Sequence, residues 1–269
     1  MGQEYVGSIS LASRGLFYSE DDFAKGVTEF PDKLTVTPWG AQEERILLSR
    51  SLGFRETLDR LIINCTNCPI PPGKLLLSDR QHLFYYMRCL SYGGAYEFPF
   101  QCDNCDQTSK HEIDLEKDLD VVYADDPKLL RELEVDALVE PFEFELPILG
   151  RSVSWRMLRG DDEKAVDKYV KKLRKKSASD GREDYEYRLA LRIVAVDSEK
   201  VDIVEALDFV REDLKGKDLE EFRYQIERVG IGIDPEIEVT CKNCGFENEI
   251  IMPLDKSFFR PPRRKASYR

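Results

Sequence analysis

Two similar stretches lie far apart in this chain: YEFPFQCDNCD at residues 96–106 and EIEVTCKNCGF at residues 236–246. In each of them, a run of aromatic or β-branched residues leads into Cys-x-x-Cys. A residue that tolerates left-handed backbone angles follows each pair, Asp106 after the first and Gly245 after the second. A second alternating run then leads away from the pair. This arrangement is typical of a zinc knuckle, and the chain contains it twice.

Zinc chemistry predicts that the two stretches meet. Structural Zn²⁺ binds four ligands in a tetrahedron, and one Cys-x-x-Cys supplies only two. We therefore expect a single site formed by Cys102, Cys105, Cys241 and Cys244. The flanking strands, 97–100 with 110–115 and 236–240 with 247–252, would pair as a zinc ribbon. Residues 106–240 then become an insertion between the two halves of the ribbon.

A third Cys-x-x-Cys competes for the site. Cys65 and Cys68 end an amphipathic helical pattern, and a proline rather than Gly or Asp follows them. They could join Cys102 and Cys105 in place of the distant pair, or all the thiols could stay reduced without a metal. Cys89 lies in an apolar helical pattern and is predicted to be a core residue. The odd count of seven cysteines, the length and the lack of a secretory leader disfavour a disulfide framework.

Composition describes an ordinary globular protein with an acidic surface. The chain has 269 residues, of which 42% are hydrophobic and 34% charged, and its net charge is −12. No apolar run reaches the 18 or so residues of a membrane span, so we expect neither a transmembrane nor an exported protein. The negative charge argues against a general nucleic-acid binder, whose binding surface should be basic.

The remaining patterns predict an α+β fold with a mainly helical body, a β-hairpin and extended terminal arms. The hairpin is expected over 141–157, because alternating runs flank a Leu-Gly turn, and helices are expected over 184–196, 201–214 and 217–229. The predicted units are an extended N-terminal arm (1–39), a helical segment (40–95), a zinc-ribbon-like domain (96–120 plus 231–255), an inserted hairpin and helical bundle (121–230), and a basic Arg/Pro tail (256–269).

The best-defined helix is predicted just before the first cysteine stretch. Ser78 and Gln81 have the spacing of a capping box, apolar residues then recur every three or four positions, and Gly93 ends the helix. His82 is interpreted as a surface or interface residue, since no ligand partner lies nearby in the sequence. His111, beside the first cysteine pair, is a weak candidate to replace one cysteine.

Nothing in the sequence predicts catalysis. The paired acidic residues stand at turns and helix starts, where carboxylates are favourable in any protein. The chain has no nucleophile elbow, phosphate loop or zinc-protease motif, and only two histidines. A zinc ion bound by four cysteines has no open position for water. We therefore expect neither an enzyme nor a small-molecule substrate.

An ordered set of motifs adds a resemblance to a known family. The motifs are SRGLFY (13–18), LSDRQHLFYYMR (77–88), the cysteine pairs at 102–105 and 241–244, and FFRP (258–261). In this order they resemble the baseplate hub and tail-assembly proteins of T4-type contractile-tailed bacteriophages. In that family the cysteine pairs are considered metal or structural positions, which by resemblance applies to Cys102, Cys105, Cys241 and Cys244.

The resemblance implies a structural component of the baseplate hub region, made in the host cytoplasm and located in the virion tail. It would assemble with hub, spike or wedge proteins through its terminal arms, which would become ordered on assembly. Two other functions stay open. One is an assembly chaperone that is absent from the mature virion, and the other is a zinc-ribbon nucleic-acid-binding module. Four thiolates suit an iron–sulfur cluster as well as zinc, so the metal is also open.

Overall fold

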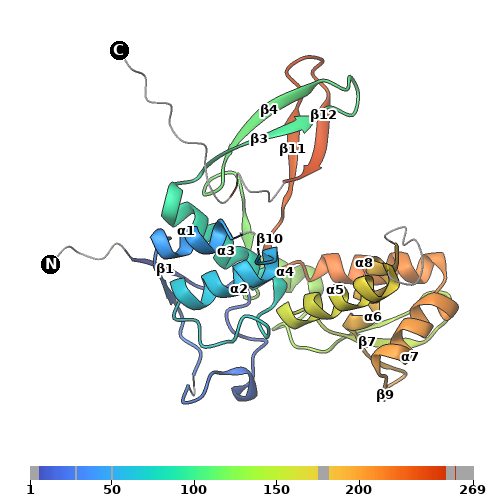
Figure 1. The fold of residues 1–269 in the computed structure, drawn as a ribbon. Helices are drawn as coiled ribbons and strands as arrows, with labels where there is room; N and C mark the ends of the chain where they lie inside the picture. Colours follow the sequence, from blue (N-terminus) through green and yellow to red (C-terminus); the bar gives the residue numbers. More distant parts are fainter. Residues whose placement is uncertain (1–5, 28, 50, 175–181, 253–257, 259–269) are drawn as a thin grey trace, which may run out of the picture.

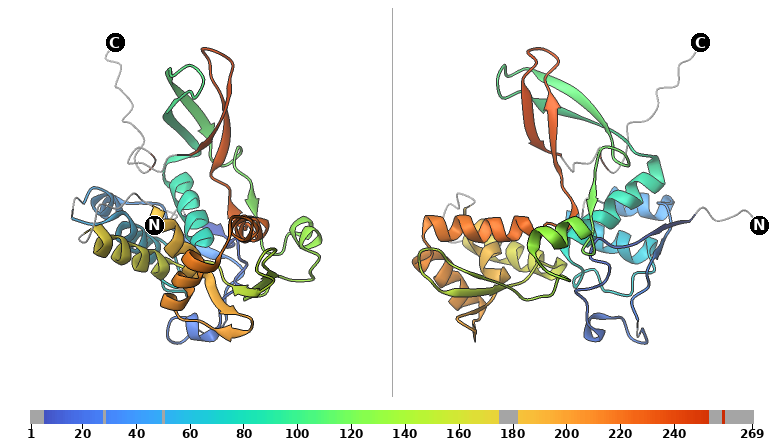
Figure 2. Two further views of the ribbon diagram at one scale, coloured as in Figure 1. Left: turned by 90° about the vertical axis from the view of Figure 1, so that its right-hand side faces the viewer. Right: turned by 180° about the vertical axis from the view of Figure 1, so that it is seen from behind.

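The computed structural model describes residues 6–27, 29–49, 51–174, 182–252 and 258. It has three parts: a helical body, two β-hairpins that project from it, and a lateral unit of sheet and helices (Figure 1). The chain builds the body first, then one hairpin, then the lateral unit, and finally returns past the body to the second hairpin (Figure 2). The architecture is α+β, as predicted.

The body is built around α3 (Leu77–Tyr92). Apolar side chains of this helix, among them Leu83, Phe84 and Met87, are fully or almost fully buried. Neighbouring elements cover it on several sides, so the helix is not simply amphipathic. The elements in contact with it are β1 (Gly7–Ile9), α2 (Phe54–Cys65) and β10 (Gly232–Ile233). The body also contains β2 (Leu34–Val36), α1 (Ala41–Leu47), β5 (Val121–Val122) and α4 (Pro127–Leu133).

The predicted capping box of α3 is wrong. The helix begins at Leu77 with Leu76 as its N-cap, which places Ser78 inside the first turn. The Leu77 amide donates instead to the Leu158 carbonyl at 3.0 Å, so a tertiary contact replaces a local cap. The predicted end is confirmed, because Gly93 follows the helix with φ of +83° and allows the chain to reverse.

The N-terminal segment is not an extended arm in its described part. Leu11, Leu34 and Val36 are fully buried or nearly so, and β1 pairs antiparallel with β2 against the body. The short 3-10 helix Glu20–Asp22 lies between the two strands in the sequence. The sequence lacked a helical period here because the segment packs as irregular chain, and its apolar side chains complete the core around α3.

The two hairpins contain the predicted strands. β3 (Ala95–Gln101) pairs with β4 (Thr108–Asp114), and β11 (Glu236–Thr240) pairs with β12 (Glu247–Ile251). Each is a separate two-stranded antiparallel sheet, and no ladder joins one hairpin to the other within the described residues. The two sheets of the predicted ribbon are therefore held together by side chains and turns alone.

The lateral unit combines a four-stranded sheet with helices. Its strands are β6 (Phe142–Glu145), β7 (Ser152–Trp155), β8 (Ile193–Val196) and β9 (Glu199–Lys200), hydrogen-bonded in this order. Its helices are α5 (Gly160–Arg174), α6 (Arg182–Arg192), α7 (Ile203–Asp208), which continues as a π-helical turn (Phe209–Asp213), and α8 (Gly216–Arg228). Trp155 and Phe222 are buried between sheet and helices, with ring centroids 6.2 Å apart.

One predicted helix of this unit is partly wrong. The helix expected over 184–196 ends at Arg192, and Ile193–Val196 form strand β8. These residues are mostly β-branched and pair with β7, so tertiary pairing overrides the helical period. The hairpin of β6 and β7 is as predicted. Among the described residues, no helix is both long enough and apolar enough to cross a membrane.

Candidate metal centre

The turns of the two hairpins meet at the end far from the body. The sulfur atoms of Cys102, Cys105, Cys241 and Cys244 all lie within 4.8 Å of one another. The Sγ atoms of Cys102 and Cys244 are 3.7 Å apart, and those of Cys105 and Cys241 are 3.8 Å apart. A tetrahedron with zinc–sulfur bonds of about 2.3 Å requires sulfur separations of about 3.8 Å. The donor set and its spacing therefore fit a four-coordinate metal ion.

Each pair of cysteines sits in the same local turn. The Asp106 amide donates to the Cys102 carbonyl and the Gly245 amide to the Cys241 carbonyl, both at 2.9 Å. Asp106 has φ of +56° and Gly245 has φ of +74°, which confirms the left-handed positions expected from the sequence. Each turn thereby points both thiols toward the other hairpin.

Two asparagines cross between the turns, and sequence reasoning missed them. Asn104 lies between Cys102 and Cys105, and its amide group donates to the Cys244 sulfur at 3.7 Å. Asn243 has the equivalent place in the second pair and donates to the Cys105 sulfur at 3.5 Å. The arrangement is thus approximately symmetric. The shared asparagine in CDNC and CKNC was the available signal.

Hydrogen bonds lower the pKa of two of the four thiols, those of Cys102 and Cys105, whereas the pKa of Cys244 is raised: the Phe246 amide lowers it, but the neighbouring thiols raise it. Desolvation raises the pKa of Cys102, but hydrogen bonds from the backbone amides of Cys105 and Asn104 and with the thiols of Cys241 and Cys244 together lower it to about 6. The Asn243 amide is the main cause of the lowered pKa of Cys105. Metal ions bind the thiolate form of cysteine, so these donors favour the form that a metal needs.

A buried asparagine joins the hairpins beside the cysteines. Asn248, on β12, is 1% exposed. Its carbonyl oxygen accepts the Asp103 amide of the other hairpin at 2.9 Å, while its amide group donates to the carbonyls of Val239 and Phe246, both at 3.1 Å. Because all of these polar atoms find partners, the residue contributes a fixed contact between the two turns.

The competing cysteines do not reach this cluster. Cys65 and Cys68 lie at the end of α2, and burial raises their pKa values to about 12 and about 11. They belong to no cluster of three or more candidate ligands among the described residues. Cys89 is a buried core residue, as predicted. His111 also stays outside the cluster and packs on the rings of Phe98 and Phe100.

The family motifs of the sequence meet along α3. Asp79, in the first turn, is fully buried and accepts hydrogen bonds from the Ser13 amide at 2.9 Å and the Tyr18 hydroxyl at 2.6 Å. Burial raises the pKa of the Asp79 carboxyl. The motif at residues 13–18 is thereby fixed on the start of the helix.

Near the other end of α3, Arg88 contacts Phe258, a residue from the C-terminal segment. Arg88 is 1% exposed and donates to the Phe258 carbonyl at 2.6 Å, to the Ala95 carbonyl at 2.9 Å and to the Gly93 carbonyl. The Phe258 ring is fully buried, with its centroid 5.1 Å from that of Tyr96. Apart from Phe258, the basic tail predicted at 256–269 lies outside the described residues.

His82 is not a surface residue, contrary to the sequence interpretation. It is 5% exposed, its Nδ1 atom has no partner among the described residues, and its ring meets Tyr123 edge-on at 5.9 Å. Burial, assisted by the nearby Arg14 charge, lowers the pKa of His82 to about 4. The histidine is therefore neutral at physiological pH.

Comparison with known proteins supports the resemblance. Residues 25–138 match the protein family described as T4 bacteriophage base plate protein. This segment contains α3 and the first cysteine hairpin but ends before the second. Searches of curated proteins and of solved structures gave no match. Residues 25–138, a segment of 114 of the 269 residues, are thus similar to the T4 bacteriophage base plate protein family.

Proposed function

We propose that this protein is a structural component of the hub region of a phage tail baseplate. The family match supports a structural role related to the baseplate. The observation that carries the finer proposal is the cysteine cluster, in which residues 142 positions apart, Cys102 and Cys244, approach to 3.7 Å. This contact between distant parts of the chain makes the hairpins rigid, and a component of a larger particle needs rigid surfaces to bind its neighbours.

We further propose that the cluster binds one structural zinc ion. Cys102, Cys105, Cys241 and Cys244 would hold it, and the ion would supply cross-linking of the two hairpins. Four thiolates leave no coordination position for water, which suits a structural and not a catalytic role. An iron–sulfur cluster uses the same ligands, and elemental analysis with an absorption spectrum of the purified protein separates the two.

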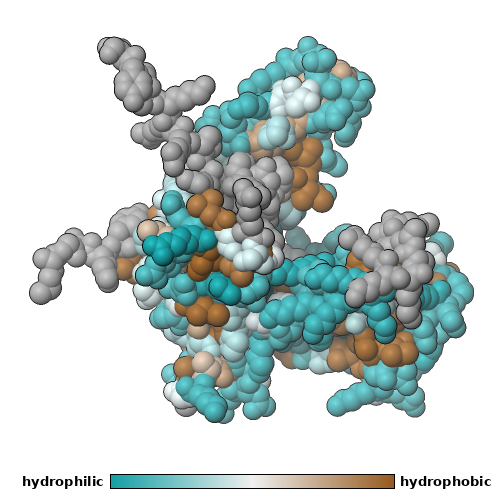
Figure 3. All heavy atoms as spheres, in the orientation of Figure 1, coloured by the Kyte–Doolittle hydropathy of each residue, from teal (hydrophilic) through white to brown (hydrophobic). Residues whose placement is uncertain are grey.

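The surface of the hairpins counts against the nucleic-acid-binding alternative. A shallow hollow beside the cysteines is lined by acidic side chains, including Asp103, Glu238 and Glu249. Hydrophilic residues dominate the far end of the hairpins (Figure 3). Phosphate groups would be repelled here, whereas a basic protein surface would be attracted.

The placement of the N-terminal segment changes how assembly is proposed to work. Apolar side chains of the described N-terminal segment, among them Leu11, Leu34 and Val36, belong to the core, so partner binding is proposed for the folded surface and not for a free N-terminal arm. The partners proposed are other baseplate or tail proteins that contact the folded surface.

Mass spectrometry of purified virions tests the proposal against the chaperone alternative. A structural component is present in mature particles at a fixed copy number relative to other baseplate proteins. Its presence in assembly intermediates together with absence from virions would overturn the structural role. A second experiment compares the yield of complete baseplates from two phage variants. Phage carrying Cys241→Ser should produce fewer complete baseplates than phage carrying Cys68→Ser.

A further inference from the structure

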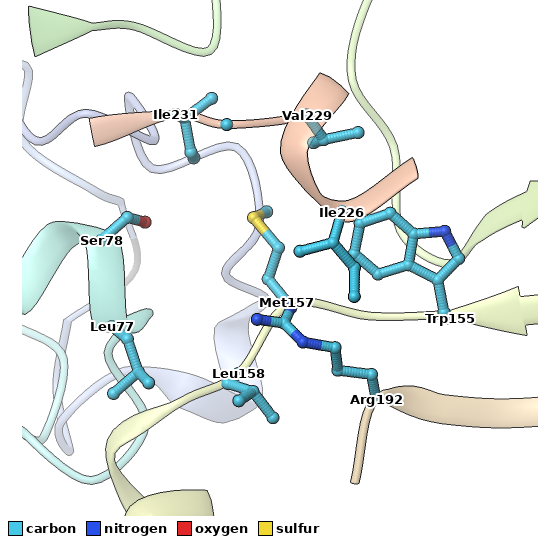
Figure 4. A pocket seen from close by; sticks show the side chains of 10 residues that line it. Leu77, Ser78, Trp155, Met157, Leu158, Arg192, Ile226, Val229 and Ile231 are labelled. Carbon is cyan, nitrogen blue, oxygen red and sulfur yellow. The ribbon is translucent and has the colours of Figure 1, made fainter. Parts of the chain in front are cut away.

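A small cavity lies where the lateral unit meets the start of α3. Its volume is about 160 Å³, and its walls come from both parts (Figure 4). Trp155, Met157 and Leu158 form one side, and Val229 and Ile231, just after α8, form another. All five are buried apolar residues. A cavity of about 150 Å³ with apolar walls accepts a group of the size of benzene, so one side chain would fill this space.

A cationic side chain also lines this apolar cavity. The Arg192 guanidinium extends toward Met157 (Figure 4) and lies 6.0 Å from the centre of the Trp155 ring. It makes no hydrogen bond or ion pair with any described residue. Burial lowers the pKa of Arg192 to about 10, so the group is still charged at physiological pH.

The nearby carboxylates are occupied by other groups. Asp162 accepts two hydrogen bonds from Arg156, at 2.7 and 2.8 Å. Glu140 accepts the Met157 amide at 2.6 Å and the Arg159 guanidinium at 3.2 Å. The cavity is therefore locally positive in a protein whose net charge is −12. The Arg192 side chain is half-buried, and a partly desolvated charge without an ion-pair partner favours an anion from outside the chain.

The opposite wall offers further groups suited to an anion. The Ser78 hydroxyl points into the cavity (Figure 4) and has no hydrogen-bond partner among the described residues. Ser78 stands in the first turn of α3, a helix of 16 residues, at the positive end of its dipole. Arg192 and Ser78 thus line one cavity from two different parts of the fold.

We propose that this cavity binds the C-terminal residue of a partner protein, with its carboxylate on Arg192 and Ser78 and an apolar side chain against Trp155. The inference rests on the proposed function for the kind of partner, a neighbouring baseplate protein. A C-terminal Leu, Ile or Phe carries the carboxylate and the apolar group on the same residue. An internal Asp or Glu would place only its short methylene stem against the apolar walls, so it matches the cavity less well.

Peptide binding tests this proposal without the phage. Pentapeptides of the form Gly-Ser-Gly-Ala-Xaa, with Xaa as Leu, Phe, Ser or Lys, are titrated as free acids and as C-terminal amides. Binding is measured by calorimetry and by tryptophan fluorescence, since Trp155 forms a wall of the cavity. We expect the Leu and Phe acids to bind at least tenfold more tightly than their amides and than the Ser and Lys acids.

Two variants locate the binding. Arg192→Gln should weaken binding of the Leu acid at least tenfold, while Arg223→Gln, an exposed arginine on α8, should leave it unchanged. Because the Arg192 guanidinium has no hydrogen-bond or ion-pair partner among the described residues, and its contact with the Trp155 ring is as long as 6.0 Å, its replacement should change the melting temperature little. If Arg192→Gln fails to fold, Ile226→Phe tests the same point by filling the cavity.

Each of four results would overturn the proposed carboxylate site. Equal binding of acid and amide, binding of inorganic phosphate without preference for an apolar residue, no binding of any peptide, or full binding to Arg192→Gln would each refute the site. None of these results bears on whether the protein is present in virions, so the failure of this inference and the failure of the proposed function are distinguishable.

Discussion

Replacing Cys241 by serine should open the two hairpins and leave the body folded. Each hairpin is a two-stranded sheet, and such a sheet is marginally stable by itself in water. Apart from the cysteines, the main polar link between the turns is the 2.9 Å hydrogen bond from the Asp103 amide to Asn248. The body depends on the packing around α3, whose side chains Leu83, Phe84 and Met87 are buried, whereas the cysteine turns lie at the far end of the hairpins.

The size of the expected effect follows from comparing the free energy contributed by a bound metal ion with that of the hydrogen bond between the turns. A structural zinc site contributes about 10–16 kcal/mol in zinc-finger peptides. A hydrogen bond contributes only about 0.5–1.5 kcal/mol net. Loss of the ion in the serine variant should lower the free energy of local opening of the hairpins. If this free energy falls by only about 4 kcal/mol, amide exchange should accelerate by roughly 10³-fold, at about 1.4 kcal/mol per tenfold change.

Hydrogen exchange followed by mass spectrometry measures the effect. We expect loss of protection at 95–114 and 236–251, unchanged protection at 77–92, and loss of about one bound zinc per chain. Cys68→Ser is the matched control, because it alters a Cys-x-x-Cys that lies outside the cluster. Retention of both zinc and protection in Cys241→Ser would refute the reasoning, as would loss of zinc in Cys68→Ser.

Three other predictions concern stability, each measured by urea unfolding. The pKa of His82 in the folded protein, about 4, lies below its ordinary value of 6.5, so the contribution of His82 to the free energy of unfolding is present above pH 6.5 and is lost as pH falls toward 4. In His82→Phe, the free energy of unfolding should therefore fall by ~3 kcal/mol less between pH 7 and pH 4 than in the parent protein. An unchanged pH profile would contradict this. Arg88→Met leaves three buried or half-buried carbonyls without their donor and should cost about 3–5 kcal/mol, and a cost below about 1 kcal/mol would show that the three bonds do not hold this end of α3. Gly245→Ala places a side chain at φ of +74° and should cost about 1–2 kcal/mol, whereas Gly216→Ala, in open space at the start of α8, should be neutral or slightly stabilising; equal effects would contradict the strain.

Local patterns of the sequence predicted the local structure well. The alternating strands beside each cysteine pair, the left-handed residues after them and the hairpin of β6 and β7 all depend on a few adjacent residues. Each of these features is confirmed. The motifs were also readable as a set, and the match over 25–138 supports, for that segment, the resemblance that they indicated.

Wrong predictions arose where a distant partner decides the outcome. Ser78 was expected to cap α3, but the Leu158 carbonyl takes the amide of Leu77 instead. His82 was interpreted as a surface or interface residue because the sequence does not show that Tyr123 lies against its ring. Pairing with β7 likewise converts Ile193–Val196 from the end of a helix into a strand.

By itself the sequence determined which residues can form cysteine turns, because the spacing of two thiols and the following left-handed residue are local properties. Only the tertiary structure decided that Cys102 meets Cys244 and leaves Cys65 aside, that apolar residues of 6–27 and 29–39 complete the core, and that Arg192 lines a cavity with no ion-pair partner in the described part of the chain. These features depend on the packing of segments that lie from 61 to 142 residues apart, and spacing along the chain carries no record of that packing.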